Sequence, residues 1–251
     1  MATVNTLQAD QYTGGRISSM EGKKIIATAV HIYTSLGLLF AFTAALGLVT
    51  SDVRLFFISL WVTIVIDSTD GLLARHFGVK EVLPHFDGRR LDDLIDFITY
   101  VFLPCVALVV FDVLPPAWSW AAVLPLLASA YGFSQDNAKT EESFVGFPSY
   151  WNVVILYLYV LNPPTWLNVV LLLGLSLCVF IPIHYIYPSK TQWLKKTTLP
   201  LTGLYGIVYG IVCLYLNADW VKALTLISLA YPAYYFFVSM AYHRRIRFAE
   251  Q

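Results

Sequence analysis

The chain of 251 residues is 58% hydrophobic but only 13% charged, and its mean hydropathy is +0.65. Soluble domains carry about 25% charged residues, so this composition excludes an ordinary soluble domain and indicates a polytopic membrane protein. The net charge is zero, so the overall charge points to no particular class of partner.

Residues 1–22 form a polar tail that lacks the apolar stretch and cleavage site of a signal peptide, so we expect the tail to stay on the protein. A membrane-spanning helix needs about 20 mostly apolar residues. This criterion predicts an all-α bundle of about eight transmembrane helices in one membrane domain that covers residues 1–251. The predicted spans are residues 25–49, 53–75, 89–111, 118–134, 148–161, 166–187, 199–216 and 220–242.

Basic residues give an independent check on these spans. If the N-terminus is cytoplasmic, all 16 lysines and arginines except Arg54 and Lys222 lie in the tail, loops and C-terminal segment on the cytoplasmic side. Such a bias toward the inside is typical of multi-pass membrane proteins. It predicts that both termini are cytoplasmic.

The second predicted span ends in acidic and small residues. Asp67, Asp70, Gly71 and Ala74 are spaced i, i+3, i+4, i+7, so a helix presents them on one face. Ionisable side chains at membrane depth are costly and need a partner or a function.

The third predicted span begins with a similar face, on which Gly88, Asp92 and Asp96 recur at intervals of four. Asp93 points away from this face, and we expect it to pair with Arg89 one turn earlier. If the two faces meet, four carboxylates surround one pocket with small residues in its walls. Divalent cations with oxygen ligands are the natural compensation for that charge.

Together the two faces read D-x-x-D-G-x-x-A-R followed by G-x-x-x-D-x-x-x-D, which resembles the signature of the CDP-alcohol phosphotransferase family. Every fixed position is present. The spacer between the two halves, residues 76–87, is longer than the family's usual one. In this it resembles the bacterial phosphatidylcholine synthase branch, as do the segments 30–34, 144–152 and 184–189.

The resemblance implies a role for each signature residue. Two divalent ions, Mn²⁺ or Mg²⁺, would be held by Asp67, Asp70, Asp92 and Asp96. Asp96 would also be the catalytic base that takes the proton of the attacking alcohol. The CDP-linked donor would lie against Gly71, Ala74, Arg75, Gly88 and Thr34.

The acceptor implied by the closer resemblance is choline. A quaternary ammonium needs aromatic faces, and four aromatic residues lie near predicted cytoplasmic helix ends: Tyr150, Trp151, Tyr185 and Tyr187. With 16% aromatic residues in the chain, an interface-anchor role for each of these remains an equal alternative.

The resemblance therefore implies an enzyme of the bacterial inner membrane that makes phosphatidylcholine and CMP from CDP-diacylglycerol and choline. Its active site would face the cytoplasm, and the family is usually homodimeric. No feature indicates a nucleic-acid partner. Three alternatives remain open: a phosphatidylserine synthase or another transferase with a different acceptor, a cation transporter, and a catalytically silent scaffold whose aspartates pair with Arg75, Arg89 and Arg90.

Overall fold

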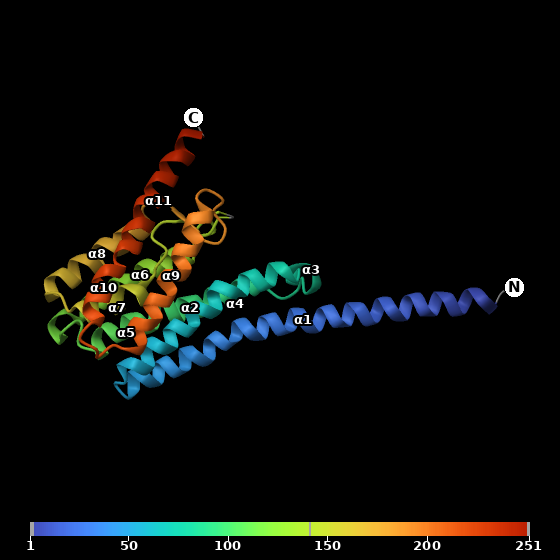
Figure 1. Cartoon of the computed structure of the whole chain (residues 1–251), viewed down its shortest axis with the longest axis horizontal. Coiled ribbons are helices and arrows are strands. Elements are labelled where there is room, and N and C mark those ends of the chain that lie inside the picture. Colours follow the sequence, from blue (N-terminus) through green and yellow to red (C-terminus); the bar gives the residue numbers. More distant parts are fainter. Residues whose placement is uncertain (1–2, 141, 250–251) are drawn as a thin grey trace.

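A computed structural model describes residues 3–140 and 142–249, and side chains from Met20 to Phe248 apart from Glu141. The first two residues of the predicted polar tail lie outside this part, and the rest of the tail forms the start of a long helix that extends well beyond the bundle (Figure 1). The helices are α1 (Thr3–Val49), α2 (Val53–His76), α3 (Val79–Val82), α4 (Gly88–Asp96), η1 (Phe97–Phe102), α5 (Leu103–Val110), η2 (Pro116–Ala122), α6 (Val123–Phe133), α7 (Trp151–Leu161), α8 (Thr165–Phe180), α9 (Lys195–Leu214), α10 (Val221–Ser228) and α11 (Ala230–Ala249).

α1 and α2 form an antiparallel hairpin (Figure 1). Asp52 begins α2 as its N-cap, because its carboxylate accepts a hydrogen bond of 2.9 Å from the backbone N–H of Leu55. Gly47 lets the helices approach closely, since a Cβ there would lie 2.8 Å from the backbone nitrogen of Phe56. The packing of this hairpin fixes where along α1 the acidic residues of α2 lie.

The third predicted span is one continuous segment made of α4, η1 and α5. Its middle part, η1, is a π-helical turn that directly follows Asp96. Pro104 at the start of α5 has no backbone N–H to donate to the preceding turn. Such π turns occur often at functional sites, and this one carries Tyr100 next to the acidic pocket.

The described part of the chain has five helical segments long and apolar enough to cross a membrane. They are Met20–Val49, Val53–His76, Gly88–Val110, Lys195–Leu214 and Val221–Phe248. Large apolar side chains cover the outside of the bundle, as Phe42, Ile227 and Phe237 illustrate with 63%, 71% and 69% exposure. The chain is therefore an all-α polytopic membrane protein. The number of eight spans and the orientation of the termini stay predictions.

Two predicted boundaries are wrong. The sixth predicted span continues to residue 187, but α8 ends at Phe180, and the next residues form the short strand β2 (His184–Ile186). β2 pairs antiparallel with β1 (Ser143–Val145), which precedes α7. The fifth predicted span, residues 148–161, becomes helical only at Trp151. A three-residue strand is too short to show a recognisable alternation of apolar and polar residues, so the sequence did not predict these two strands.

Candidate metal centre

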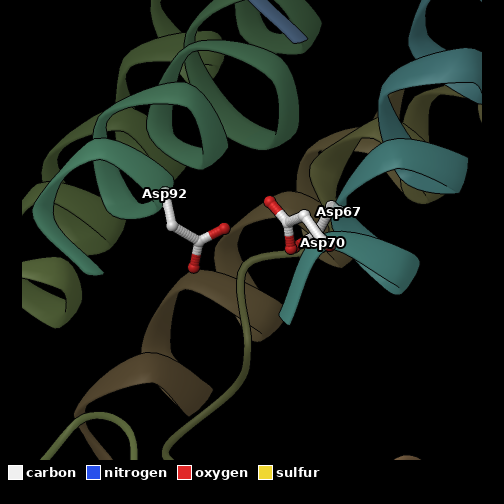
Figure 2. A group of neighbouring side chains, drawn as sticks. All are labelled: Asp67, Asp70 and Asp92. Carbon is white, nitrogen blue, oxygen red and sulfur yellow. The ribbon is translucent and has the colours of Figure 1, made fainter. Parts of the chain in front are cut away.

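The acidic faces of α2 and α4 meet. Figure 2 shows Asp67 and Asp70 on α2 facing Asp92 on α4. Ligand oxygens of these three residues lie within 4.8 Å of one another, and the same holds for Asp92, Asp93 and Asp96. Asp92 thus belongs to two adjoining carboxylate groups. The arrangement expected from the helical spacing of the aspartates is present.

These carboxylates line a small pocket between α1, α2 and the third segment. Four aspartates contribute to its wall together with small or hydroxyl residues; the lining is Thr34, Gly37, Thr63, Ile66, Asp67, Asp70, Asp92, Ile95, Asp96 and Thr99. Asp70 and Asp96 are only 6% and 9% exposed. Carboxylate and hydroxyl oxygens are ligands that suit a hard divalent cation such as Mg²⁺ or Mn²⁺.

A tyrosine that was not predicted holds one of these carboxylates. The Tyr100 hydroxyl donates a hydrogen bond of 2.7 Å to Asp67 Oδ2 from the π-helical turn. Tyr100 follows Asp92 and Asp96 at the same interval of four residues. This spacing could have predicted that Tyr100 lies on the same helix face as the two aspartates. A neighbouring hydrogen bond of this kind fixes the orientation of a metal-binding carboxylate.

A loop lysine contacts three carboxylates at the pocket. The Lys139 ammonium lies 2.7 Å from Asp93, 3.2 Å from Asp96 and 3.5 Å from Asp92. Burial alone would lower the pKa of Lys139, but the carboxylates of Asp96, Asp92 and Asp93 outweigh burial and raise it. Lys139 is therefore positively charged at neutral pH.

The arginines near the aspartates do not neutralise the pocket. Arg89 contacts Asp93 at 3.8 Å, which confirms the predicted pair, and Arg90 contacts Asp87 at 3.9 Å. The prediction that Asp93 points away from the acidic face is wrong, because its carboxylate lies beside those of Asp92 and Asp96 and contacts Lys139. Among the described residues, Lys139 is the only lysine or arginine within 4 Å of Asp67, Asp70, Asp92 or Asp96. One ammonium beside four aspartates leaves an excess of negative charge, which the scaffold hypothesis does not explain.

The predicted donor-binding residues do not all line this pocket. Thr34 lines it, and the Arg75 guanidinium lies over Gly71, where a Cβ would be 3.3 Å from Arg75 Nη1. Ala74 packs against the small apolar cluster of Ala27, Val30 and Val79 instead.

Gly88 leaves room for a histidine. A Cβ at Gly88 would lie 2.7 Å from His31 Cε1, and the His31 ring packs against Phe86 with a centroid separation of 4.2 Å. The space over Gly88 is thus filled by a side chain of α1 in this structure.

An aromatic cluster adjoins the acidic pocket through Tyr100. The Tyr150 ring centroid lies 6.0 Å from that of Tyr100 and 6.1 Å from that of Tyr235. The Phe144 ring stacks on Tyr187 at 4.6 Å and meets Tyr150 at 6.3 Å. The aromatic cluster (Tyr100, Phe144, Tyr150, Tyr187 and Tyr235) therefore contains two of the four predicted acceptor residues.

The other two predicted acceptor residues lie deeper. Trp151 is 2% exposed, and its indole N–H donates a hydrogen bond of 2.7 Å to Ser129 in the core. Tyr185 is 3% exposed and stacks on Tyr235 with a centroid separation of 6.2 Å. Tyr185 thus contacts the aromatic cluster through Tyr235, on which it stacks. Trp151 instead packs against Phe147.

The chain is similar in sequence to several phosphatidylcholine synthases. No protein-family model matches the chain. It is 36% identical over 188 residues to the phosphatidylcholine synthase of Legionella bozemanae, covering 72% of this chain and 87% of that protein. It is 39% identical over 195 residues to the Legionella pneumophila phosphatidylcholine synthase, with coverages of 72% and 75%. The Pseudomonas aeruginosa phosphatidylcholine synthase is 34% identical over 226 residues, which are 89% of this chain and 94% of that protein.

Proposed function

The chain belongs to the phosphatidylcholine synthase family, and on this basis we propose that it makes phosphatidylcholine and CMP from CDP-diacylglycerol and choline. The observation that carries the proposal is the meeting of the α2 and α4 aspartates in one buried pocket. A phosphatidylserine synthase has the same kind of reaction, but none of the relatives above bears that name. Neither they nor the pocket favours a cation transporter.

The aspartates have a defined task in this reaction. Asp67, Asp70, Asp92 and Asp96 would hold two divalent ions, either Mn²⁺ or Mg²⁺. When bound, such ions neutralise the pyrophosphate of the donor and the charge that grows on the leaving CMP. Tyr100 keeps the Asp67 carboxylate oriented for this purpose.

Transfer requires one bond to form and one to break. The choline hydroxyl oxygen attacks the phosphorus that carries diacylglycerol, and the bond from that phosphorus to the CMP oxygen breaks. Asp96 accepts the hydroxyl proton, since it is a buried carboxylate within the pocket. Arg75 is exposed, and no described carboxylate lies within 4 Å of its guanidinium, so it is available to a donor phosphate.

We assign choline to the aromatic cluster, with Tyr150 and Tyr187 as its principal contacts. The Lys190 ammonium lies 4.2 Å from the centroid of the Tyr187 ring, while Phe144 stacks on the same ring. The ring therefore binds a cation in the protein, and choline would have to displace Lys190 to use this face. Tyr185 would act indirectly by supporting Tyr235, and Trp151 would maintain the core beneath Tyr150.

We also propose that the protein lies in the inner membrane of a bacterium, with the pocket at the cytoplasmic side, from which choline can enter and into which CMP can leave. Support comes from the distribution of basic residues along the sequence and from the bacterial relatives. A homodimer remains part of the proposal by resemblance to the wider family.

The experiment is an assay of CMP release by purified full-length protein in detergent–lipid micelles that contain CDP-diacylglycerol. Choline, serine and glycerol 3-phosphate are supplied separately, each with Mn²⁺, with Mg²⁺ and with a chelator. We expect CMP and phosphatidylcholine only with choline and only with a divalent ion. Turnover with serine or glycerol 3-phosphate but not choline would refute the acceptor, and full activity in chelator would refute the metal centre.

A further inference from the structure

The two carboxylate groups of the pocket differ in what compensates their charge. Asp67, Asp70 and Asp92 form the first group, and no lysine or arginine of the described chain contacts Asp67 or Asp70. Asp92, Asp93 and Asp96 form the second group, and all three contact the Lys139 ammonium. The Lys139 ammonium thus lies among the carboxylates of the second group and contacts the first group only through Asp92.

A defined hairpin presents Lys139 to the pocket. Lys139 forms an antiparallel bridge with Phe144, and the Val145 N–H donates a hydrogen bond of 2.9 Å to the carbonyl of Ala138. The Thr140 N–H donates a hydrogen bond of 2.9 Å to the Ser143 carbonyl and closes the turn. Since β1 continues this hairpin and pairs with β2, the sheet fixes the position from which the lysine reaches inward.

The ammonium and a divalent ion cannot share the second group. A divalent ion binds carboxylate oxygens at about 2.0–2.6 Å, whereas Lys139 Nζ stands 2.7–3.5 Å from the same oxygens. Both cations would then lie within a few ångströms of each other in a buried site, where like charges repel strongly.

We propose that Lys139 occupies the position of the second divalent ion in the resting protein and leaves it when that ion binds. This inference rests on the proposed function, because it requires the acidic pocket to be a metal centre. It makes metal loading ordered: the first ion enters between Asp67, Asp70 and Asp92, where the lysine contacts Asp92 alone, and the second has to displace the lysine from Asp92 and Asp96. The lysine thereby offsets part of the negative charge of the pocket before the donor arrives.

The first test measures Mn²⁺ binding to the full-length protein in detergent, by electron paramagnetic resonance of free Mn²⁺ and by calorimetry, without substrate. Wild type is expected to bind one ion more tightly than the second. Lys139→Met is expected to tighten the second ion by roughly tenfold, since a charge-assisted competitor is gone, and Lys139→Arg is expected to behave like wild type. Lys80→Met is the matched control, because Lys80 is exposed and makes no ion pair within 4 Å among the described residues.

The second test needs no variant. An amine-acylating reagent and mass spectrometry measure the reactivity of Lys139 in wild-type protein, with and without saturating Mn²⁺. The reactivity is expected to rise several-fold when Mn²⁺ displaces the ammonium, whereas that of Lys80 stays constant. Unchanged Lys139 reactivity, or equal second-ion affinity in Lys139→Met and wild type, would overturn the inference.

These outcomes separate the two proposals. If wild type and Lys139→Met both bind no Mn²⁺, the metal centre itself is wrong. If both bind two ions with the same affinities, the metal centre stands and only the role of Lys139 is wrong.

Discussion

Replacing Tyr100 with phenylalanine is the most informative single change next to the pocket. The ring remains in the core, and only the hydroxyl that donates to Asp67 at 2.7 Å is removed. A hydrogen bond to a charged group is worth about 1.5–3 kcal/mol. Loss of a partner that orients a metal ligand typically weakens metal affinity by about 10- to 100-fold, which is about 1.4–2.7 kcal/mol and agrees with that range.

The assay is CMP release as a function of Mn²⁺ concentration at saturating choline. We expect Tyr100→Phe to need about 10–100 times more Mn²⁺ for half-maximal rate, with a smaller effect on the rate at saturation. Tyr209→Phe is the matched control, since Tyr209 is a buried tyrosine that donates to the carbonyl of Asn152 at 3.1 Å, away from the carboxylates. An unchanged Mn²⁺ requirement in Tyr100→Phe, or an equal shift in both variants, would refute this reasoning.

Two further predictions concern the acceptor and the sheet. Tyr187→Leu keeps an apolar side chain but loses a cation–π face worth about 1–2 kcal/mol, so the KM for choline should rise about five- to thirtyfold with no change in the Mn²⁺ requirement. Tyr187→Phe should stay close to wild type, and equal KM values for all three proteins would contradict the assignment. Gly146→Ala should lower the thermal unfolding temperature in detergent, because Gly146 has φ +83° and its Cβ would collide with the carbonyl of Val179. Gly174→Ala, in open space on α8, is the control, and equal unfolding temperatures would contradict the structural role of Gly146.

What could be predicted from the sequence is what local helical geometry determines. The spacing of Asp67 and Asp70, and of Asp92 and Asp96, orients each pair within its own helix, and a short link brings the helices together. The Arg89–Asp93 pair follows from the same i, i+4 rule.

The partners that were missed depend on longer-range contacts. Lys139 reaches Asp96 across 43 residues of sequence, and nothing in the loop distinguishes it from a lysine in any other loop. Trp151 and Tyr150 are neighbours in the sequence, yet one side chain enters the core and the other meets the aromatic cluster. Ser149, directly before this pair, has a φ of 59°, a backbone conformation that no recognisable signal in the sequence indicates.

The most direct test of the metal centre is Asp92→Asn, because Asp92 is the one carboxylate shared by both groups. Mn²⁺ binding and CMP release should be measured on the same purified, folded sample, next to Asp136→Asn in the exposed loop as control. The proposed function predicts that Asp92→Asn loses at least one bound Mn²⁺ together with nearly all CMP release, whereas the control retains both. Wild-type Mn²⁺ binding and turnover in folded Asp92→Asn would contradict it.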